Sequence, residues 1–297
     1  MRTRFAPAPT GYLHLGHVAN ALTVWGEARA RGAAVLLRIE DHDRQRCRPE
    51  YEAALLEDLE WLGFVPDLAP PAVFRRGPTP YRQSDNGAAY VAAVAQLEAA
   101  GHQVYACDCS RRRLLARSGA AEASDIEIPY DGYCRDRGLS HGSGRALRVR
   151  LPDGVERFDD LRLGPQVQEP AAQCGDLMLR DRLGNWTYQF AVVVDDRDQG
   201  VDLVIRGMDL LASTGRQRAL ARLLGVVDPP RVLHHALLRK PGGAKLSKSD
   251  HDTSVRDLRA LGRTPADLFG LALQGLGSEA PGSLPLEEAL GRAASPA

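Results

Sequence analysis

The first 63 residues alternate between short apolar strands and helices, and this alternation restricts the possible fold more than any other feature. Strands are expected over Arg2–Ala6 and Val35–Ile39, and helices over Leu15–Arg31 and from Pro49 to Gly63. A continuously apolar strand such as the second is typical of a parallel sheet that is buried on both faces. Strand–helix repeats at this spacing predict a doubly wound, Rossmann-like α/β fold.

The middle of the chain breaks this rhythm. A helix near Asn86–Ala100 is followed by clustered cysteines, an arginine-rich segment and short strands such as Ala146–Leu151. The α/β pattern returns with Phe190–Asp195 and Val201–Arg206, and then a helix from about Asp209 to Leu224. We therefore predict a catalytic domain in two halves, residues 1–100 and 186–250, with an inserted α+β domain over 101–185 and a short helical C-terminal segment over 251–297.

Composition leaves the partners open. With 38 basic and 38 acidic residues the formal net charge is zero, so a nucleic acid would have to meet a local basic patch. No apolar signal core and no membrane-spanning run is present, so a cytoplasmic monomer that does not bind membranes is expected. In that compartment the five cysteines are expected to be free, metal-bound or catalytic rather than disulfide-paired.

Residues 7–17 read Pro-Ala-Pro-Thr-Gly-Tyr-Leu-His-Leu-Gly-His and connect the first predicted strand to the first predicted helix. Open α/β sheets bind ligands at this edge. His14 and His17 would point imidazole donors at an anion, beside the free amides of the helix start, and Gly16 would let a nucleotide approach closely. On spacing alone, a structural pair or half of a metal site also fits. Neither a P-loop nor a dinucleotide-binding motif is present.

The three lysines of the chain, Lys240, Lys245 and Lys248, lie within nine residues, and all the other basic residues are arginines. Lysine carries a compact charge on a flexible stem, which suits a phosphate that moves during a reaction. Two glycines in the same loop free the backbone. The pattern indicates either a mobile anion-binding loop or chance clustering in a lysine-poor chain.

Three cysteines, Cys107, Cys109 and Cys134, could supply thiolates to a zinc ion, which prefers four ligands. The fourth ligand could come from one of three nearby residues, His102, Asp108 or His141. Reduced, buried cysteines are the alternative. Cys47 and Cys174 are interpreted as bystanders.

The two loops together resemble the signature motifs of class I aminoacyl-tRNA synthetases, with His-Leu-Gly-His at residues 14–17 and Lys-Leu-Ser-Lys-Ser at residues 245–249. Further segments resemble the glutamyl branch: residues 4–11, 37–41, 188–196 and 204–207. A full glutamyl-tRNA synthetase has a large C-terminal anticodon-binding region, whereas only about 45 residues follow the lysine loop here. The chain therefore resembles the truncated branch, the glutamyl-Q tRNA(Asp) synthetase family.

This resemblance implies a ligase that uses ATP, accompanied by Mg²⁺, to activate L-glutamate. Enzymes of the truncated branch attach the glutamate to the queuosine base in the anticodon loop of tRNA(Asp), not to the 3′ end. A truncated glutamyl-tRNA synthetase, a nucleotidyltransferase acting on a small molecule and a non-catalytic paralogue that binds tRNA or glutamate are the alternatives. No residue can be named as a ligand of the Mg²⁺ ion.

The resemblance also assigns roles to residues. The catalytic set would be His14, His17, Lys245 and Lys248, and ATP would be bound by His14, Gly16, His17 and Lys248. Glutamate would be held by Arg4, Phe5, Ala6, Pro7, Ala8, Glu40, Tyr188 and Arg206, with the arginines on carboxylates and Glu40 on the ammonium group. One structural Zn²⁺ would be bound by Cys107, Cys109, Tyr130 and Cys134. Ala8 stands where glutamyl synthetases commonly have serine, so one possible hydroxyl contact to glutamate is absent.

The segment from Ser110 to Arg150 contains nine arginines and five acidic residues. This surplus of positive charge could meet the phosphates of a tRNA, or it could form an ordinary solvated face. Arginine also stacks on unpaired bases, which suits an anticodon loop.

Overall fold

The first two strands pair in parallel, as the opening pattern predicts. In this computed structural model, which describes residues 1–119, 128–238 and 253–294, β1 (Arg2–Phe5) pairs with β2 (Ala34–Leu37) from Arg2↔Ala34 to Phe5↔Leu37. Helix α1 (Leu15–Ala30) connects them. The chain turns into β2 at Gly32, whose φ of +61° favours glycine.

A second parallel pair continues this layer. β8 (Leu203–Gly207) pairs in parallel with β9 (Arg231–His235). Asp202, the residue before β8, donates a backbone hydrogen bond of 3.1 Å from its N to Arg2 O of β1. The apolar segment Phe190–Asp195 lies within helix α7 (Tyr188–Asp198). The predicted helix after β8 is divided into a 3₁₀ turn, η2 (Met208–Ser213), and α8 (Thr214–Leu223). Residues from the two ends of the catalytic part are thus adjacent.

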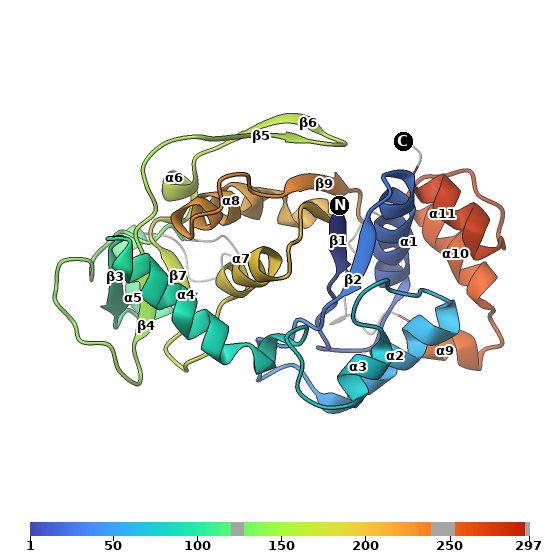
Figure 1. Cartoon of the computed structure of the whole chain (residues 1–297), viewed down its shortest axis with the longest axis horizontal. Helices are drawn as coiled ribbons and strands as arrows, with labels where there is room; N and C mark the ends of the chain where they lie inside the picture. The colour runs from blue at the N-terminus through green and yellow to red at the C-terminus, as the bar shows by residue number, and fades with distance from the viewer. Residues whose placement is uncertain (120–127, 239–252, 295–297) are drawn as a thin grey trace.

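The inserted segment forms its own antiparallel sheet, on the left of Figure 1. β3 (Val104–Cys107), β4 (Ala146–Val149) and β7 (Leu177–Arg180) pair in the order β3-β4-β7. Helices α4 (Gly87–Ala99), α5 (Arg111–Ser118) and α6 (Pro170–Cys174) accompany this sheet.

One hairpin from the same segment joins the catalytic sheet instead. β5 (Glu156–Asp160) pairs antiparallel with β6 (Gly164–Gln168), and its last residue, Asp160, pairs in parallel with Val232 of β9. In Figure 1 the hairpin runs along the top of the molecule, from the inserted lobe toward β9. The inserted segment therefore contributes strands to two different sheets.

Helices cover the catalytic part. They are α2 (Pro49–Leu62), α3 (Pro71–Arg75), α9 (Val255–Ala260), α10 (Pro265–Gly275) and α11 (Leu286–Ala294), with a short 3₁₀ turn η1 (Gln83–Asp85). Thr264 and Asp267 form a reciprocal capping box at the start of α10, where the sequence predicts a helix. In the part of the chain that is described, no helix has both the length and the apolar character to cross a membrane.

Helix α1 is clamped between the sheet and the C-terminal helices, α10 and α11, at the right of Figure 1. One close approach is at Gly26, which is buried in the middle of α1. A Cβ atom at this position would lie 2.5 Å from the backbone oxygen of Leu290 in α11. Glycine at this position is thus a requirement of helix packing.

We predict that Gly26→Ala destabilises the protein by about 1–3 kcal/mol, because the new methyl group meets backbone rather than a movable side chain. Gly291→Ala is the matched control, since a Cβ at Gly291 of α11 meets no atom within 4 Å. That control should gain up to about 1 kcal/mol from helix propensity. Urea unfolding of both variants and the parent measures the difference, and equal stability of Gly26→Ala and the parent would refute the packing argument.

Candidate active site

A cavity of about 490 Å³ lies at the carboxyl ends of β1, β2 and β8, beside the start of α1. Most residues that the sequence analysis assigned to glutamate and ATP line it: Arg4, Ala6, Pro7, Ala8, His14, Gly16, His17, Glu40, Tyr188 and Arg206. Phe5 is placed differently, because its side chain is buried in the core with its ring 5.3 Å from the ring of Trp25. The structure therefore brings these residues to one place, whereas their individual roles stay predictions.

The two histidines form the N-terminal cap of α1. His14 Nδ1 accepts a hydrogen bond of 3.0 Å from Gly16 N, and His17 Nδ1 accepts one of 3.1 Å from His14 N. A ring nitrogen that accepts from a backbone N–H carries no proton, so each neutral imidazole bears its hydrogen on Nε2. A Cβ at residue 16 would lie 2.8 Å from His14 Cε1, so Gly16 lets this ring fold back over the helix start. Both rings line the cavity as Nε2–H donors.

Lys240, Lys245 and Lys248 lie outside the described residues. The described residues on either side of them reach the cavity: Leu238 lines it, and Ser254 forms an antiparallel bridge with His14. Of the two described residues, Leu238 thus lies at the cavity and Ser254 lies beside the histidine cap.

Arg38 is a fully buried guanidinium behind the cavity wall. It donates to Asp196 Oδ1 at 2.7 Å and to Glu40 Oε1 at 3.0 Å. Asp196 Oδ1 also accepts from Arg4 Nε at 3.1 Å. Burial acts to raise the pKa of Asp196, but Arg4 and Arg38 lower this pKa below its ordinary value. Arg38 thus fixes the acid Glu40 directly and the cation Arg4 through an ionised Asp196.

Arg206 near the end of β8 is buried as well, but its hydrogen-bond partners are uncharged groups. It donates to Gln217 Oε1 at 2.7 Å, to Thr214 Oγ1 at 2.9 Å and to His234 Nε2 at 3.0 Å. A nitrogen that accepts from a guanidinium is unprotonated, so His234 is neutral. Burial lowers the pKa of Arg206. Within the described residues, no carboxylate is bonded to this buried cation.

Tyr188 begins α7 and faces the cavity, with its ring 6.0 Å from the ring of His42. Burial raises the pKa of Tyr188, so the phenol keeps its O–H donor at neutral pH. Both rings line the first cavity.

Sequence analysis did not single out Arg38, His42, Asp160, Asp196 or His234. The signal for Arg38 and Asp196 was available, because each interrupts or ends an apolar run that becomes buried. No local signal connects Asp160 with His234, since their contact depends on how the β5–β6 hairpin returns to the sheet.

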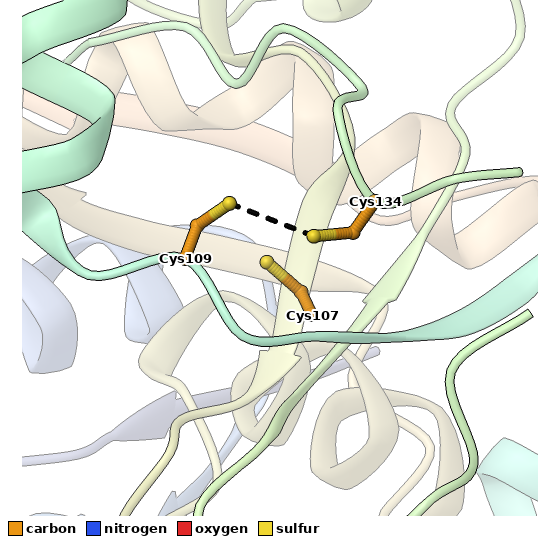
Figure 2. Close-up of side chains that lie close together, drawn as sticks. All are labelled: Cys107, Cys109 and Cys134. Carbon is orange, nitrogen blue, oxygen red and sulfur yellow. Dashed lines mark hydrogen bonds between the residues drawn. The ribbon is translucent and has the colours of Figure 1, made fainter. Parts of the chain in front are cut away.

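The three predicted metal-binding cysteines converge at the end of β3 (Figure 2). The ligand atoms of Cys107, Cys109 and Cys134 all lie within 4.8 Å of one another, and the Sγ atoms of Cys109 and Cys134 are 3.5 Å apart. Sulfur atoms around tetrahedral zinc would be about 3.8 Å apart, because the Zn–S bond is about 2.3 Å. These buried residues could hold a metal ion.

Of the residues predicted as a fourth ligand, Tyr130 and Asp108 lie against the cluster, and Tyr130 is near two of its sulfur atoms. The Tyr130 hydroxyl lies 3.3 Å from Cys107 Sγ and 3.8 Å from Cys109 Sγ. His102 is directed to the backbone oxygen of Leu223, and His141 lies near Glu98. Asp108 Oδ1 accepts from Cys134 Sγ at 3.3 Å and lies next to the cluster. Cys47 and Cys174 are not members of the cluster.

A second cavity, of about 680 Å³, lies between the inserted sheet and the starts of α7 and α8. Four arginines from separate segments line it, and we call it the basic groove: Arg111, Arg148, Arg182 and Arg216. Two acidic residues also line it. Asp176 is bound bidentately by Arg135, with N–O distances of 2.8 and 2.9 Å, and Asp181 accepts from the side chain of Asn185 and from two backbone amides. Thr187 and Gln189 line the basic groove while Tyr188 lines the first cavity, so the two cavities flank the start of α7.

Comparison with known proteins assigns the class. The family model of tRNA synthetases class I (E and Q), catalytic domain, matches residues 1–286. The glutamate-tRNA synthetase of Elizabethkingia anophelis has the same fold with a TM-score of 0.80 and 28% identity over 98% of this chain. This chain spans 65% of the length of that structure, which is less than two thirds. Fold and site thus define a class I tRNA synthetase catalytic domain, an enzyme of the ligase type.

Two curated relatives narrow the assignment. A glutamyl-Q tRNA(Asp) synthetase of Geobacter sulfurreducens is 44% identical over 282 residues, which cover 95% of this chain and 86% of the relative. One of Bordetella bronchiseptica is 47% identical over 251 residues, covering 83% of this chain and 74% of the relative. The chain belongs to the glutamyl-Q tRNA(Asp) synthetase family, as the motifs predicted.

Proposed function

We propose that this protein activates L-glutamate with ATP and transfers it to the queuosine base in the anticodon loop of tRNA(Asp). The observation that carries the proposal is that two buried cations, Arg4 and Arg206, and one acid, Glu40, line the same cavity. Arg206 has only neutral partners among the described residues, so a substrate carboxylate would complete its pairing. Glu40 offers the matching contact for an ammonium group. The cytoplasm, where ATP and tRNA meet, is the expected location.

In the first step a carboxylate oxygen of glutamate attacks the α-phosphate of ATP, and pyrophosphate leaves. In the second step a nucleophile of the queuosine base attacks the activated carbonyl carbon, and AMP leaves. Both steps depend on positioning and charge neutralisation more than on a covalent nucleophile. The Nε2–H donors of His14 and His17 would bind phosphate oxygens at the positive end of α1. Lys245 and Lys248 would neutralise the charge that develops, and Mg²⁺ bound to ATP would shield its phosphates.

The basic groove is proposed to hold the tRNA. Its exposed arginines, Arg111 and Arg182, can bind phosphates or stack on unpaired bases, whereas Arg148 is buried and stacked on Tyr130. Both of its acids accept hydrogen bonds from protein groups. Because the groove and the first cavity share the start of α7, a nucleotide bound there would lie next to the activated glutamate.

The decisive experiment offers labelled glutamate, ATP and tRNA(Asp) that either contains or lacks queuosine. Label should enter only the queuosine-containing tRNA and should survive removal of the 3′-terminal nucleotide. Label on the 3′ ribose, or on tRNA(Glu), would instead support a truncated glutamyl-tRNA synthetase. Absence of glutamate-dependent exchange of pyrophosphate into ATP, with or without tRNA, would favour a non-catalytic paralogue.

We predict that Arg206→Met weakens glutamate binding by roughly 100-fold, because a charge-assisted contact in a desolvated site is lost. ATP binding should change by no more than a few-fold. Arg218→Met is the control, because Arg218 lies on α8 against Phe158, outside the first cavity. Calorimetric titration with each ligand, together with thermal unfolding of each variant, checks this. Equal glutamate affinity of Arg206→Met and the parent would exclude Arg206 from the pocket.

We further propose that Cys107, Cys109, Cys134 and Tyr130 bind one structural Zn²⁺. The geometry of the cluster supports this, and so do the nearby guanidinium groups. Arg117 donates to Cys109 Sγ and Arg137 to Cys134 Sγ, each at 3.4 Å, so cationic donors border the sulfur atoms that would carry negative charge in a zinc site. A bound zinc ion would cross-link the end of β3 to the segment around residue 134.

Metal analysis tests this site. The parent should contain about one zinc ion per chain, as expected for a single closed tetrahedral site. Cys109→Ser should lose most of this zinc, whereas Cys47→Ser, a change outside the cluster, should retain it. Equal, negligible zinc in the parent and in Cys109→Ser would discard the site.

A further inference from the structure

Three buried side chains form a line of hydrogen bonds across the ends of three neighbouring strands. Asp160 on β5 contacts His234 on β9, with 2.5 Å between Oδ2 and Nδ1. His234 Nε2 accepts from Arg206 Nε on β8 at 3.0 Å. The exposed fractions of Asp160, His234 and Arg206 are 3%, 0% and 5%. Only Arg206 reaches the active-site cavity.

The chemistry of the donors fixes the direction of this line. A guanidinium can only donate, so His234 Nε2 must be a lone pair. The proton of the neutral ring is therefore on Nδ1 and is donated to Asp160. Asp160 is itself held in place, because its Oδ1 accepts from the backbone amides of Arg162 at 3.0 Å and Leu163 at 2.9 Å. Each group has one orientation that satisfies its neighbours.

We propose that Asp160 and His234 are positioning residues for glutamate, because they hold the Arg206 guanidinium in the orientation that receives the substrate carboxylate. This inference rests on the proposed role of Arg206 in glutamate binding. It assigns a function to a strand of the inserted segment that does not touch the substrate.

Because the His234 imidazole lies between Asp160 and Arg206, the acid can orient the guanidinium without neutralising its charge. Arg4 contacts the Asp196 carboxylate directly, so much of its charge is already balanced. An acid placed directly on Arg206 would likewise compete with the substrate carboxylate. A neutral ring transmits the orientation from Asp160 but brings no negative charge into contact with Arg206. Arg206 therefore keeps its attraction for an incoming anion.

The variant Asp160→Asn separates this idea from a simple loss of packing. The backbone amides of Arg162 and Leu163 would keep the amide oxygen of the new asparagine, so its NH₂ group would face His234. A donor there forces the ring proton from Nδ1 to Nε2. Nε2–H would then face the Nε–H of Arg206, and this Nε–H would lose its acceptor, while Gln217 and Thr214 would still accept from the other guanidinium nitrogens. Shape is almost unchanged, but the polarity of the line is reversed, and Oδ2 no longer accepts the hydrogen bond that His234 N donates to it at 3.1 Å in the parent.

Glutamate-dependent pyrophosphate exchange measures the consequence. Asp160→Asn and His234→Leu should raise the KM for glutamate roughly tenfold or more, the scale of a lost hydrogen bond to a charged group. The KM for ATP should stay within about twofold, since the hydrogen-bond line does not reach the histidine cap. His234→Gln should raise the KM for glutamate less, because the glutamine amide can donate to Asp160 and accept from Arg206. His102→Gln is the matched control, as His102 contacts the backbone of Leu223 away from the cavity.

Two further readouts do not depend on catalytic rate. In ¹⁵N-histidine spectra, His234 of the parent should show the Nδ1–H tautomer, and Asp160→Asn should show the Nε2–H tautomer. Acidification should also raise the KM for glutamate in the parent but not in His234→Gln, because a protonated ring presents a donor to Arg206. Burial and the nearby charges of Arg206 and Arg4 lower the pKa of His234, whereas Asp160 acts to raise it. The increase in KM should therefore occur at a pH below the range in which an ordinary imidazole titrates. Besides Asp160 and Arg206, the Thr214 hydroxyl faces the ring at 3.2 Å.

A KM for glutamate in Asp160→Asn within about twofold of the parent would overturn the inference, because so small a change means that no hydrogen bond to the guanidinium was lost. So would a fall in kcat at unchanged KM. Failure of the parent itself to show glutamate-dependent exchange would instead refute the proposed function. The two failures are therefore distinguishable.

Discussion

The buried guanidinium of Arg38 is the interaction on which the active site depends. It joins the segment after β2 to the end of α7 through Asp196 and Gln199, it holds Glu40 in the same segment, and Asp196 in turn holds Arg4 on β1. A buried ion network tolerates the loss of a member poorly, because each remaining charge is then left unpaired in a medium of low dielectric constant. The cavity wall is therefore assembled as one unit when residues near both ends of the catalytic part meet.

Within this wall the two cations have different electrostatic states. Arg4 forms an ion pair with Asp196, whereas Arg206 is held by neutral acceptors. A buried cation without a carboxylate partner costs folding free energy, which a fold retains where a ligand supplies the missing charge. If glutamate binds as proposed, the same asymmetry predicts a strong contact at Arg206 and a weaker one at Arg4.

Much of this could be predicted from the sequence because its signals are local. The apolar run at Val35–Ile39 predicted a parallel strand, and the His14–His17 spacing predicted two rings at one helix start. What could not be predicted depends on contacts between distant residues. Asp196 is 158 residues from Arg38 and 192 from Arg4, and no periodicity reports such a contact. The acceptor role of the two Nδ1 atoms in capping also required the backbone geometry.

The β5–β6 hairpin shows why the inserted segment matters to chemistry as well as to binding. The hairpin lies between β4 and β7 in sequence, yet β5 ends against β9, where Asp160 meets His234. The segment thus leaves the catalytic sheet, builds its own sheet with the cysteine cluster, and returns one carboxylate to His234, behind the first cavity. The orientation of Arg206 consequently depends on the docking of this hairpin. A relative with a different insertion would need another group to satisfy Nδ1 of the corresponding imidazole.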